Sequence, residues 1–538
     1  MAFMPVNNIH TSLLFGLLSF WCNEVLSQSD RYIIYFKDKA GNTFSSNKPE
    51  EFLSAKAIDR RLTNNVAVTS EDLPVNLAYK QALSAAGAKV LFTSRWFNCA
   101  LVESTAPVSS AISQLPMVSS VEYVAPGATA TGRGSRVNKK YETFSASASA
   151  GQLSMLGIDR LHRDGFTGEG VTIAVMDSGF PGVPALGAFE HLRTGGRIRD
   201  SYNFAYGRKD VYGFDAHGEN VLSIMAARTP TFTGSAPDAS FLLYVTEYVP
   251  SEYRVEEFNW LFAAERADSA GADVINTSLG YFTFDDPSMD HTYASMDGKT
   301  TLISRAAAKA AERGIIVVCS AGNEGAGSWK FISAPADAAA VIAVGAVDAQ
   351  GVRASFSSVG PSADGRTKPD LMAQGAPSQF INTSGANAAG SGTSFSSPIA
   401  AGMVAGLRQA LPDLTASELI ARIRASGDRA QNPDNLYGYG IPDYSKFSDL
   451  ITGVGEPTAF RVFPNPGNGE LIRFKTDSNE ADHHVTIMNF AGTAITAGLA
   501  TRAGNQLWEF SAGGLPEGIY LVKVRTAGQV HISRWVVR

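Results

Sequence analysis

The chain is poor in cysteine for its length. It has 538 residues and three cysteines, of which Cys22 lies in an N-terminal apolar stretch. The other two, Cys99 and Cys319, are too few for the framework of a small disulfide-stabilised protein. Hydrophobic residues make up 44% of the chain, which is ordinary for a globular protein. We therefore expect stability to come from a large core rather than from cross-links.

Charge is also sparse and has no concentrated sign. Charged residues make up 18% of the chain and the formal net charge is −6. The sequence has no dense stripe of Lys and Arg, which nucleic-acid-binding surfaces require. We expect no nucleic-acid partner, and a monomer as the default state.

No apolar run is long enough to span a bilayer. Residues 13–22, LLFGLLSFWC, have the length of the hydrophobic region of a signal peptide, and the short residues Val25-Leu26-Ser27 follow. We predict a signal peptide over residues 1–27. The alternative is that this stretch is a buried helix of the next domain.

The rest of the chain divides by pattern into three folded parts. Residues 28–125 mix strand and helix patterns and predict a small α+β domain; a linker rich in Gly, Ala and Ser follows over 126–151. Residues 152–448 alternate short apolar runs with helical stretches, which is typical of a doubly wound, mainly parallel α/β sheet. A hinge over 449–456 leads to residues 457–538, whose alternating pattern predicts a small antiparallel β-sandwich.

Four fragments of the central part carry residues with chemical potential. Asp177 ends the run VTIAVM, where a carboxylate points into the crevice beyond the sheet. His217 opens an apolar helix, and Asn323 follows a buried strand. Ser394 lies at the start of the helix in GTSFSSPIAAG, so its backbone N–H has no partner within the helix and can bind an anion. Each fragment alone also fits an ordinary cap, turn or core residue.

Taken together and in this order, the fragments resemble the subtilisin-like serine proteases, or subtilases. The resemblance covers about residues 152–448 and is carried by these stretches: TGEGVTIAVMDSG, HGENV, GSAPDA, INTSLG, VVCSAGNEG, APADAAAVIAVGAVD, KPDLMAQG and GTSFSSP. It implies the subtilisin-like fold and a Ser-His-Asp triad. Ser394 would be the nucleophile, His217 the general base, Asp177 the residue that orients it, and Asn323 an oxyanion donor.

The resemblance also implies a substrate-binding surface. An extended segment that pairs with the substrate backbone matches Ser278, Leu279 and Gly280. The walls and floor of the primary specificity pocket match Ala321, Gly322 and Ser333.

The chain departs from the subtilase pattern after the histidine. Glu219 stands where a threonine is usual, and a carboxylate there is expected to raise the pKa of His217. Some subtilases bind calcium, and residues 284–298 are rich in Asp but lack EF-hand spacing. We expect a solvated acidic loop, no metal among the catalytic residues and no required cofactor, with calcium left open.

The flanking parts also resemble known modules. Residues 28–125 are similar to subtilase propeptides, which implies an inhibitor and folding chaperone cleaved within the linker. Residues 457–538, with Phe463-Pro464-Asn465-Pro466 and a basic, apolar final strand, resemble the sorting domain of type IX secretion substrates. A carbohydrate-binding β-sandwich is the alternative. The sorting domain implies the type IX machinery as a partner, passage through the periplasm of a Gram-negative bacterium, and release or attachment at the cell surface.

The sequence therefore predicts a secreted serine endopeptidase that hydrolyses protein or peptide substrates through an acyl-enzyme. Two alternatives stay open: an exopeptidase or self-processing peptidase with the same chemistry, and an inactive surface-binding protein with a protease fold.

Overall fold

A computed structural model describes these residues: 29–127, 142–143, 149–447, 450–451, 462–463, 465, 467–476, 482–489, 493–504, 507–526 and 530–537. The predicted signal peptide lies outside them, as do most of the predicted linker and hinge. The chain forms two compact units, one up to Ser445 and one from Lys446.

The first unit is built on a seven-stranded sheet in which every strand pair is parallel. Its strands, in spatial order, are β14 (Leu371–Gln374), β13 (Ile342–Val347), β12 (Ile316–Ser320), β11 (Val274–Thr277), β6 (Thr172–Asp177), β10 (Ser240–Val245) and β7 (Ile198–Asn203). All but the edge strand β7 are buried along nearly their whole length, because helices cover both faces. The predicted α/β fold class is confirmed.

The helices on one face bring the candidate residues to the sheet. Helix α10 (Thr393–Ala410) packs on β11 to β14, and α7 (His217–Ala226) packs beside it and against β6. Small residues allow the close approach: a Cβ on Gly402 would lie 1.9 Å from the Ser235 hydroxyl oxygen. Pro398 lies inside α10. Shorter helices complete the unit: α4 (Ala150–Ser154), α5 (Ile158–Arg163), α6 (Glu190–Thr194) and α11 (Ala416–Ser426).

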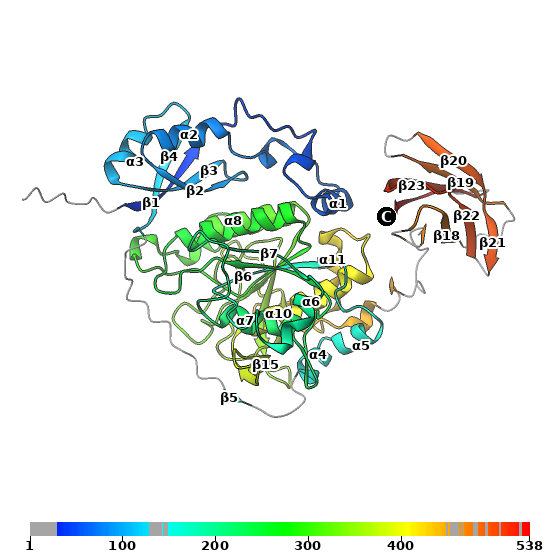
Figure 1. Cartoon of the computed structure of the whole chain (residues 1–538). Helices are drawn as coiled ribbons and strands as arrows, with labels where there is room; N and C mark the ends of the chain where they lie inside the picture. The colour runs from blue at the N-terminus through cyan, green and yellow to red at the C-terminus, as the bar shows by residue number, and fades with distance from the viewer. Residues whose placement is uncertain are drawn as a thin grey trace, which may run out of the picture. The chain divides into compact units, whose positions relative to one another are not determined.

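Helices α8 (Val255–Ala270) and α9 (Leu302–Glu312) pack against each other and connect the central sheet to the N-terminal region. Figure 1 shows α8 between the central sheet and the sheet of the N-terminal region. One continuous hydrophobic core runs from the central strands through α8 and α9 to Ile33, Trp96 and Leu101 of the N-terminal region.

The N-terminal region has a four-stranded antiparallel sheet with the order β2 (Lys89–Ser94), β3 (Cys99–Ser104), β1 (Asp30–Phe36) and β4 (Val118–Ala125). Its other face buries a separate apolar cluster under α2 (Leu77–Ala85) and α3 (Ala106–Ile112). A further helix, α1 (Ala55–Thr63), lies outside this sandwich and contacts α8. The predicted α+β region is thus present.

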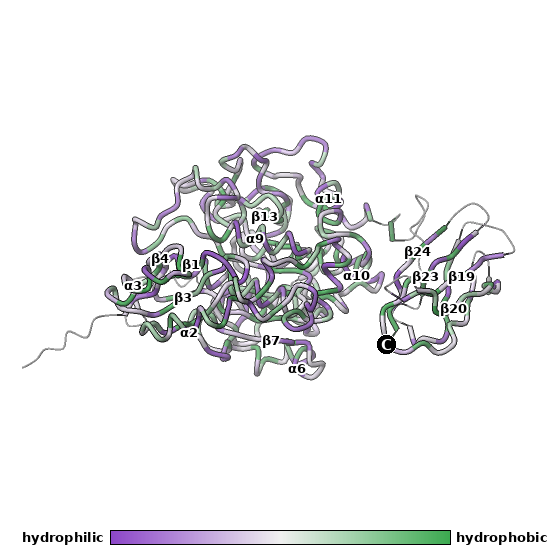
Figure 2. Tube along the Cα trace, turned by 90° about the horizontal axis from the view of Figure 1, so that it is seen from above, coloured by the Kyte–Doolittle hydropathy of each residue, from purple (hydrophilic) through white to green (hydrophobic). Residues whose placement is uncertain are grey.

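The second unit has two antiparallel sheets. One has the order β17 (Val462–Phe463), β18 (Leu471–Lys475), β22 (Leu507–Ser511) and β21 (Thr501–Gly504), and the other β20 (Ala494–Leu499), β19 (His484–Met488), β23 (Gly518–Arg525) and β24 (Val530–Val537). Buried and more exposed residues alternate along β19, β22 and β23, and Figure 2 shows hydrophilic and hydrophobic residues mixed in this unit. Inward residues of both sheets, such as Trp508 and Trp535, share one buried cluster. The unit is therefore a β-sandwich, as the alternation predicts.

Within the residues that the structure describes, no helix has the length and apolar character needed to cross a membrane. Cys99 and Cys319 are both buried and free, and burial raises the pKa of each thiol.

Candidate active site

Asp177 and His217 meet at the carboxyl end of the central sheet. Asp177 is the last residue of β6 and is fully buried, while His217 is the first residue of α7. The His217 Nδ1 lies 2.8 Å from Asp177 Oδ1, which also accepts hydrogen bonds from the backbone and side chain of Ser178. Gly218 makes this approach possible, because a Cβ there would lie 2.9 Å from the Asp177 Cβ. The carboxylate therefore fixes the orientation of the ring through Nδ1 and leaves Nε2 to accept a proton.

Opposing effects set the pKa of His217. Burial, the largest single effect, lowers it, whereas the Asp177 carboxylate raises it by charge and by hydrogen bond, and the carboxylates of Glu247 and Asp215 add to this rise. The net shift is upward from the ordinary value of 6.5. The side chain stays 26% exposed, so its free edge can meet a substrate.

Glu219 does not act on His217 as we expected. Its side chain is fully buried and accepts a hydrogen bond from the backbone N–H of Gly182, in the loop that follows β6. Burial raises the pKa of Glu219 itself. Glu219, which replaces the usual threonine, is therefore held by a hydrogen bond from the backbone.

Ser394 is the second residue of α10 and exchanges hydrogen bonds with Ser278. Its hydroxyl donates to the Ser278 carbonyl at 3.1 Å, and the Ser278 hydroxyl donates to the Ser394 carbonyl at 2.9 Å. The neighbouring Phe395 ring lies 6.2 Å from the His217 ring, measured between centroids. Ser394 is thus at the same edge as the His217–Asp177 pair, with its hydroxyl turned toward Ser278 rather than toward the imidazole.

Two N–H donors flank Gly392 next to this serine. A Cβ built on Gly392 would lie 3.7 Å from Asn323 Nδ2 and 3.8 Å from the Ser394 backbone nitrogen. Thr393 orients the amide of Asn323, since its N–H and hydroxyl donate to Asn323 Oδ1 at 2.8 and 3.0 Å. The oriented amide lies beside Gly392 and beside a helix N-terminus, which favours negative charge.

The predicted substrate-binding residues surround the same place. Ser278, Leu279 and Gly280 follow β11, and Ala321 and Gly322 follow β12. The hydroxyl oxygen of Ser333 lies between the two loops, 2.1 Å from a Cβ built on Gly280 and 3.2 Å from one built on Gly322. Both glycines are therefore needed for Ser333 to lie there.

Comparison with known proteins decides the family. The model of the subtilase family matches residues 168–440, which is half of the chain. The chain belongs to the subtilase family. Two further models match on either side: a Bacteroidota propeptide domain of the same peptidase class over residues 31–142, and a secretion system C-terminal sorting domain over residues 461–538.

Relatives of this subtilase include well-known bacterial enzymes. Subtilisin NAT of Bacillus subtilis subsp. natto is 31% identical over 295 residues, which cover 54% of this chain and 68% of that protein. Subtilisin BL of Lederbergia lenta is 30% identical over 54% of this chain and 94% of its own length. The crystal structure of an epidermin leader peptide processing serine protease from Staphylococcus aureus superposes with a TM-score of 0.55 at 17% identity, over 80% of this chain and all of that one.

Some residues of this subtilase site were not singled out from the sequence. Asp215 accepts a hydrogen bond from the His217 backbone N–H at 2.8 Å, and Asn276 accepts one from the Ser397 hydroxyl at 2.9 Å. Thr393 holds Asn323, as described above. The only signal for them was that each lies within or beside a motif; which atoms they contact depends on the fold.

Three carboxylates of the acidic stretch 284–298 accept hydrogen bonds from the backbone of that stretch, and a fourth, Asp285, accepts from the Glu252 N–H. Asp286 accepts from the Ser288 N–H, Asp290 from the Phe284 N–H and Asp297 from the Lys299 N–H. Among the described residues, no group of three or more His, Cys, Asp or Glu side chains is arranged to hold a metal ion. The absence of a required cofactor stays a prediction.

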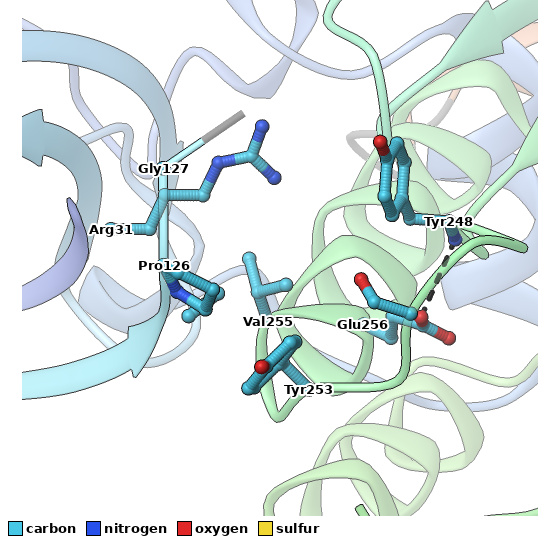
Figure 3. Close-up of a pocket in the computed structure, with 9 residues that line it drawn as sticks. Arg31, Pro126, Gly127, Tyr248, Tyr253, Val255 and Glu256 are labelled. Carbon is cyan, nitrogen blue, oxygen red and sulfur yellow. Dashed lines mark hydrogen bonds between the residues drawn. The ribbon is translucent and has the colours of Figure 1, made fainter. Parts of the chain in front are cut away.

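A pocket lies beside the end of β4. It is lined on one side by Arg31, Pro126 and Gly127, and on the other by residues of the peptidase region, among them Tyr248 and Glu256. Arg31 projects toward the cavity from the propeptide side (Figure 3). The Glu256 carboxylate lies 3.4 Å from the Tyr248 N–H and 3.4 Å from the Tyr281 hydroxyl. Neither Asp177 nor His217 lines this pocket, so it is separate from the candidate active site.

Proposed function

We propose that this subtilase is a secreted serine endopeptidase in which Ser394, His217 and Asp177 form the triad and Asn323 is an oxyanion donor. The observation that carries the proposal is the 2.8 Å contact between His217 and Asp177 at the same sheet edge as Ser394. A triad needs a nucleophile, a base and a residue that orients the base.

The chemistry begins when the Ser394 hydroxyl turns from the Ser278 carbonyl to the imidazole. His217 Nε2 takes the hydroxyl proton while Oγ attacks the scissile carbonyl carbon. Asp177 accepts the Nδ1–H bond throughout and stabilises the imidazolium. The imidazolium then protonates the leaving amine, which leaves an acyl-enzyme on Ser394. Water, activated by the same imidazole, hydrolyses the ester and restores the serine.

The negative oxygen of each tetrahedral intermediate would lie between the Ser394 N–H and the Asn323 amide. These donors are fixed before substrate arrives, because Thr393 holds the Asn323 oxygen. Preorganised donors stabilise charge without further rearrangement. Ser278, Leu279 and Gly280 would pair with the substrate backbone, and Ala321, Gly322 and Ser333 would shape the pocket for the side chain before the scissile bond.

The flanking domains suggest how the enzyme is made and exported. We propose that the bounds predicted from the sequence hold: signal peptide 1–27, propeptide 28–125, linker 126–151, peptidase 152–448, hinge 449–456 and sorting domain 457–538. The propeptide would inhibit the peptidase until the linker is cut. The sorting domain would direct the chain from the periplasm through the type IX machinery to the cell surface or the medium.

Covalent labelling tests the triad directly. Purified mature enzyme and its Ser394→Ala variant are treated with a fluorophosphonate probe, and hydrolysis of a peptide library is followed by mass spectrometry. We expect the probe on Ser394, internal cleavage of peptides, and loss of both in the variant. Labelling with removal of terminal residues only would indicate an exopeptidase. A native chain that neither labels nor cleaves would contradict the enzyme and favour a binding protein.

A further inference from the structure

Helix α1 reaches the peptidase far from the candidate active site. It lies between β1 and β2 in sequence but packs where α8 and α9 end rather than on its own sheet. Gly271, just after α8, and Gly314, close after α9, both have positive φ values, and each leaves space that α1 uses. A Cβ on Gly271 would lie 2.8 Å from the Lys56 Cβ, and one on Gly314 would lie 2.4 Å from Asn64 Nδ2.

Arg60 of α1 donates hydrogen bonds to backbone carbonyls at and just after the ends of both peptidase helices. The last carbonyls of a helix have no partner within it. The Arg60 guanidinium donates to the Ala272 carbonyl at 2.6 Å, to the Arg313 carbonyl at 3.0 Å and to the Asp268 carbonyl at 3.3 Å. The Ser54 N–H adds a bond to the Ser269 carbonyl at 2.9 Å. Residues 54–64, which we call the arm, thus cap α8 and α9 from outside the peptidase.

A buried charge cluster joins the arm to the peptidase. The Asp268 carboxylate is fully buried and contacts three propeptide guanidiniums: Arg60, Arg61 and Arg95. The charges are reversed in a second set of contacts: the guanidinium of Arg313, on the peptidase, lies 3.3 Å from the propeptide carboxylate of Asp72 and 3.2 Å from that of Glu71. Removing the propeptide would leave Asp268 without these three cations, at the negative end of α8.

The rim of the arm adds polar contacts close to the starts of three further elements, β6, β11 and α11. Lys56 lies 2.6 Å from the Asp273 carboxylate and donates to the Gly170 carbonyl at 2.9 Å. Asn64 accepts from the N–H of Ala416, the first residue of α11, at 2.6 Å. Gly170 and Asp273 lie just before β6 and β11, whereas Asp177 and Ser278 lie at the carboxyl ends of those strands. The arm therefore lies at the amino ends of the strands of this sheet, and the candidate catalytic residues lie at their carboxyl ends.

We propose that the ends of α8 and α9 form a docking surface for the arginine-bearing arm, and that this surface keeps the propeptide bound after the linker is cut. The inference deepens the proposed function and rests on the propeptide acting as inhibitor. Because the arm does not contact the catalytic edge, its grip does not depend on what occupies the cleft. Dissociation of the arm from the ends of α8 and α9, rather than cleavage of the linker, then determines when the peptidase is released from its propeptide.

The experiment measures how long the cut propeptide stays bound. Full-length chain carrying Ser394→Ala is cut by limited trypsin within residues 128–141, where the sequence offers Arg133, Arg136, Lys139 and Lys140. Dissociation after dilution is followed by size-exclusion chromatography and mass spectrometry. We expect Arg60→Ala to release the propeptide at least about tenfold faster than its parent, since a buried, hydrogen-bonded charge partner governs the dissociation rate.

Three further variants sharpen the result. Lys56→Ala removes a contact at the rim of the arm and should release the propeptide faster by a smaller factor; it decides the matter if Arg60→Ala does not fold. Asp268→Asn removes the acceptor from the peptidase side and should behave like Arg60→Ala. Lys89→Ala is the matched control, because its 2.9 Å salt bridge to Glu103 lies within the propeptide and its side chain is 72% exposed.

Equal dissociation rates for the parent and the arm variants would overturn the anchor, as would immediate release from the parent. Failure of the proposed function is seen separately, as absence of fluorophosphonate labelling in a chain that keeps Ser394. The cut Ser394→Ala chain tests the anchor whether or not the native chain is an enzyme.

Discussion

At the level of single residues, the pKa of His217 depends on the carboxylates that surround it. Its type and place in the motif HGENV were enough to nominate it. The carboxylates that raise its pKa come from separate segments: Asp177 ends β6, Asp215 precedes α7 and Glu247 follows β10. Glu219, only two residues away in sequence, turns to Gly182 instead. Distance along the sequence does not decide this, because Asp215 is also two residues from His217 and does raise its pKa.

This arrangement predicts the pH dependence of hydrolysis. A general base works only when neutral, so a raised pKa moves the acid limb of kcat/KM upward, to a midpoint above 6.5. Glu247→Gln removes a charge that favours the imidazolium, so its acid limb should move to lower pH. Glu219→Gln is the control and should leave the midpoint unchanged. Profiles of kcat/KM against pH for the three proteins check this, and a shift in Glu219→Gln alone would contradict it.

Asn323 leads to a prediction about the oxyanion. Replacing it by Ala removes the amide donor beside Gly392, and we expect kcat to fall about 10²- to 10³-fold with little change in KM. Thr393→Ser keeps the hydroxyl that holds the Asn323 oxygen and should stay close to wild type. Steady-state kinetics on a peptide substrate measure both. An Asn323→Ala enzyme with unchanged kcat would remove this residue from the mechanism.

Among the helices and strands, α7 and α10 place the chemistry, and glycine governs how closely they approach. The apolar runs and small residues predicted both helices and the parallel strands between them. The glycine at position 218 indicates a close approach of another chain segment, but the sequence could not show which atoms come close. The fit depends on the Gly179 carbonyl, which would lie 2.6 Å from a Cβ at position 218.

Gly218→Ala should therefore push α7 away from the loop after β6. We expect a loss of about 1–3 kcal/mol in the free energy of unfolding from overpacking. Misplacement of His217 should lower kcat/KM by about 100-fold. Gly151→Ala is the control, since a Cβ there meets nothing within 4 Å. Chemical denaturation and kinetics of both variants provide the measurements, and two equally stable, equally active variants would refute the packing argument.

For the whole molecule, the chain separates export from catalysis. The first unit ends at Ser445 and contains the complete candidate site, and the sorting domain matches residues 461–538 in the second unit. The long-range hydrophobic core joins the propeptide to the peptidase within the first unit. We thus expect the two units to be separable in function.

A chain truncated after Phe447 tests this separation. Produced in a Bacteroidota host, it should keep peptidase activity in cell extracts but be lost from the surface and the medium, because the sorting domain is missing. The full chain is the control, and activity is assayed in each fraction. Equal export of the truncated chain would show that residues 448–538 are not needed for sorting.

The sequence by itself determined the fold class, the order of the domains and the identity of the candidate residues, because apolar periodicity and conspicuous motifs are local properties of the chain. Only the tertiary structure decided which carboxylates face His217, that the Ser394 hydroxyl donates to Ser278, and that Arg60, Arg61 and Arg95 gather around Asp268. The reason is physical: these contacts join residues up to about 200 positions apart, and their distances are set by how helices and strands pack.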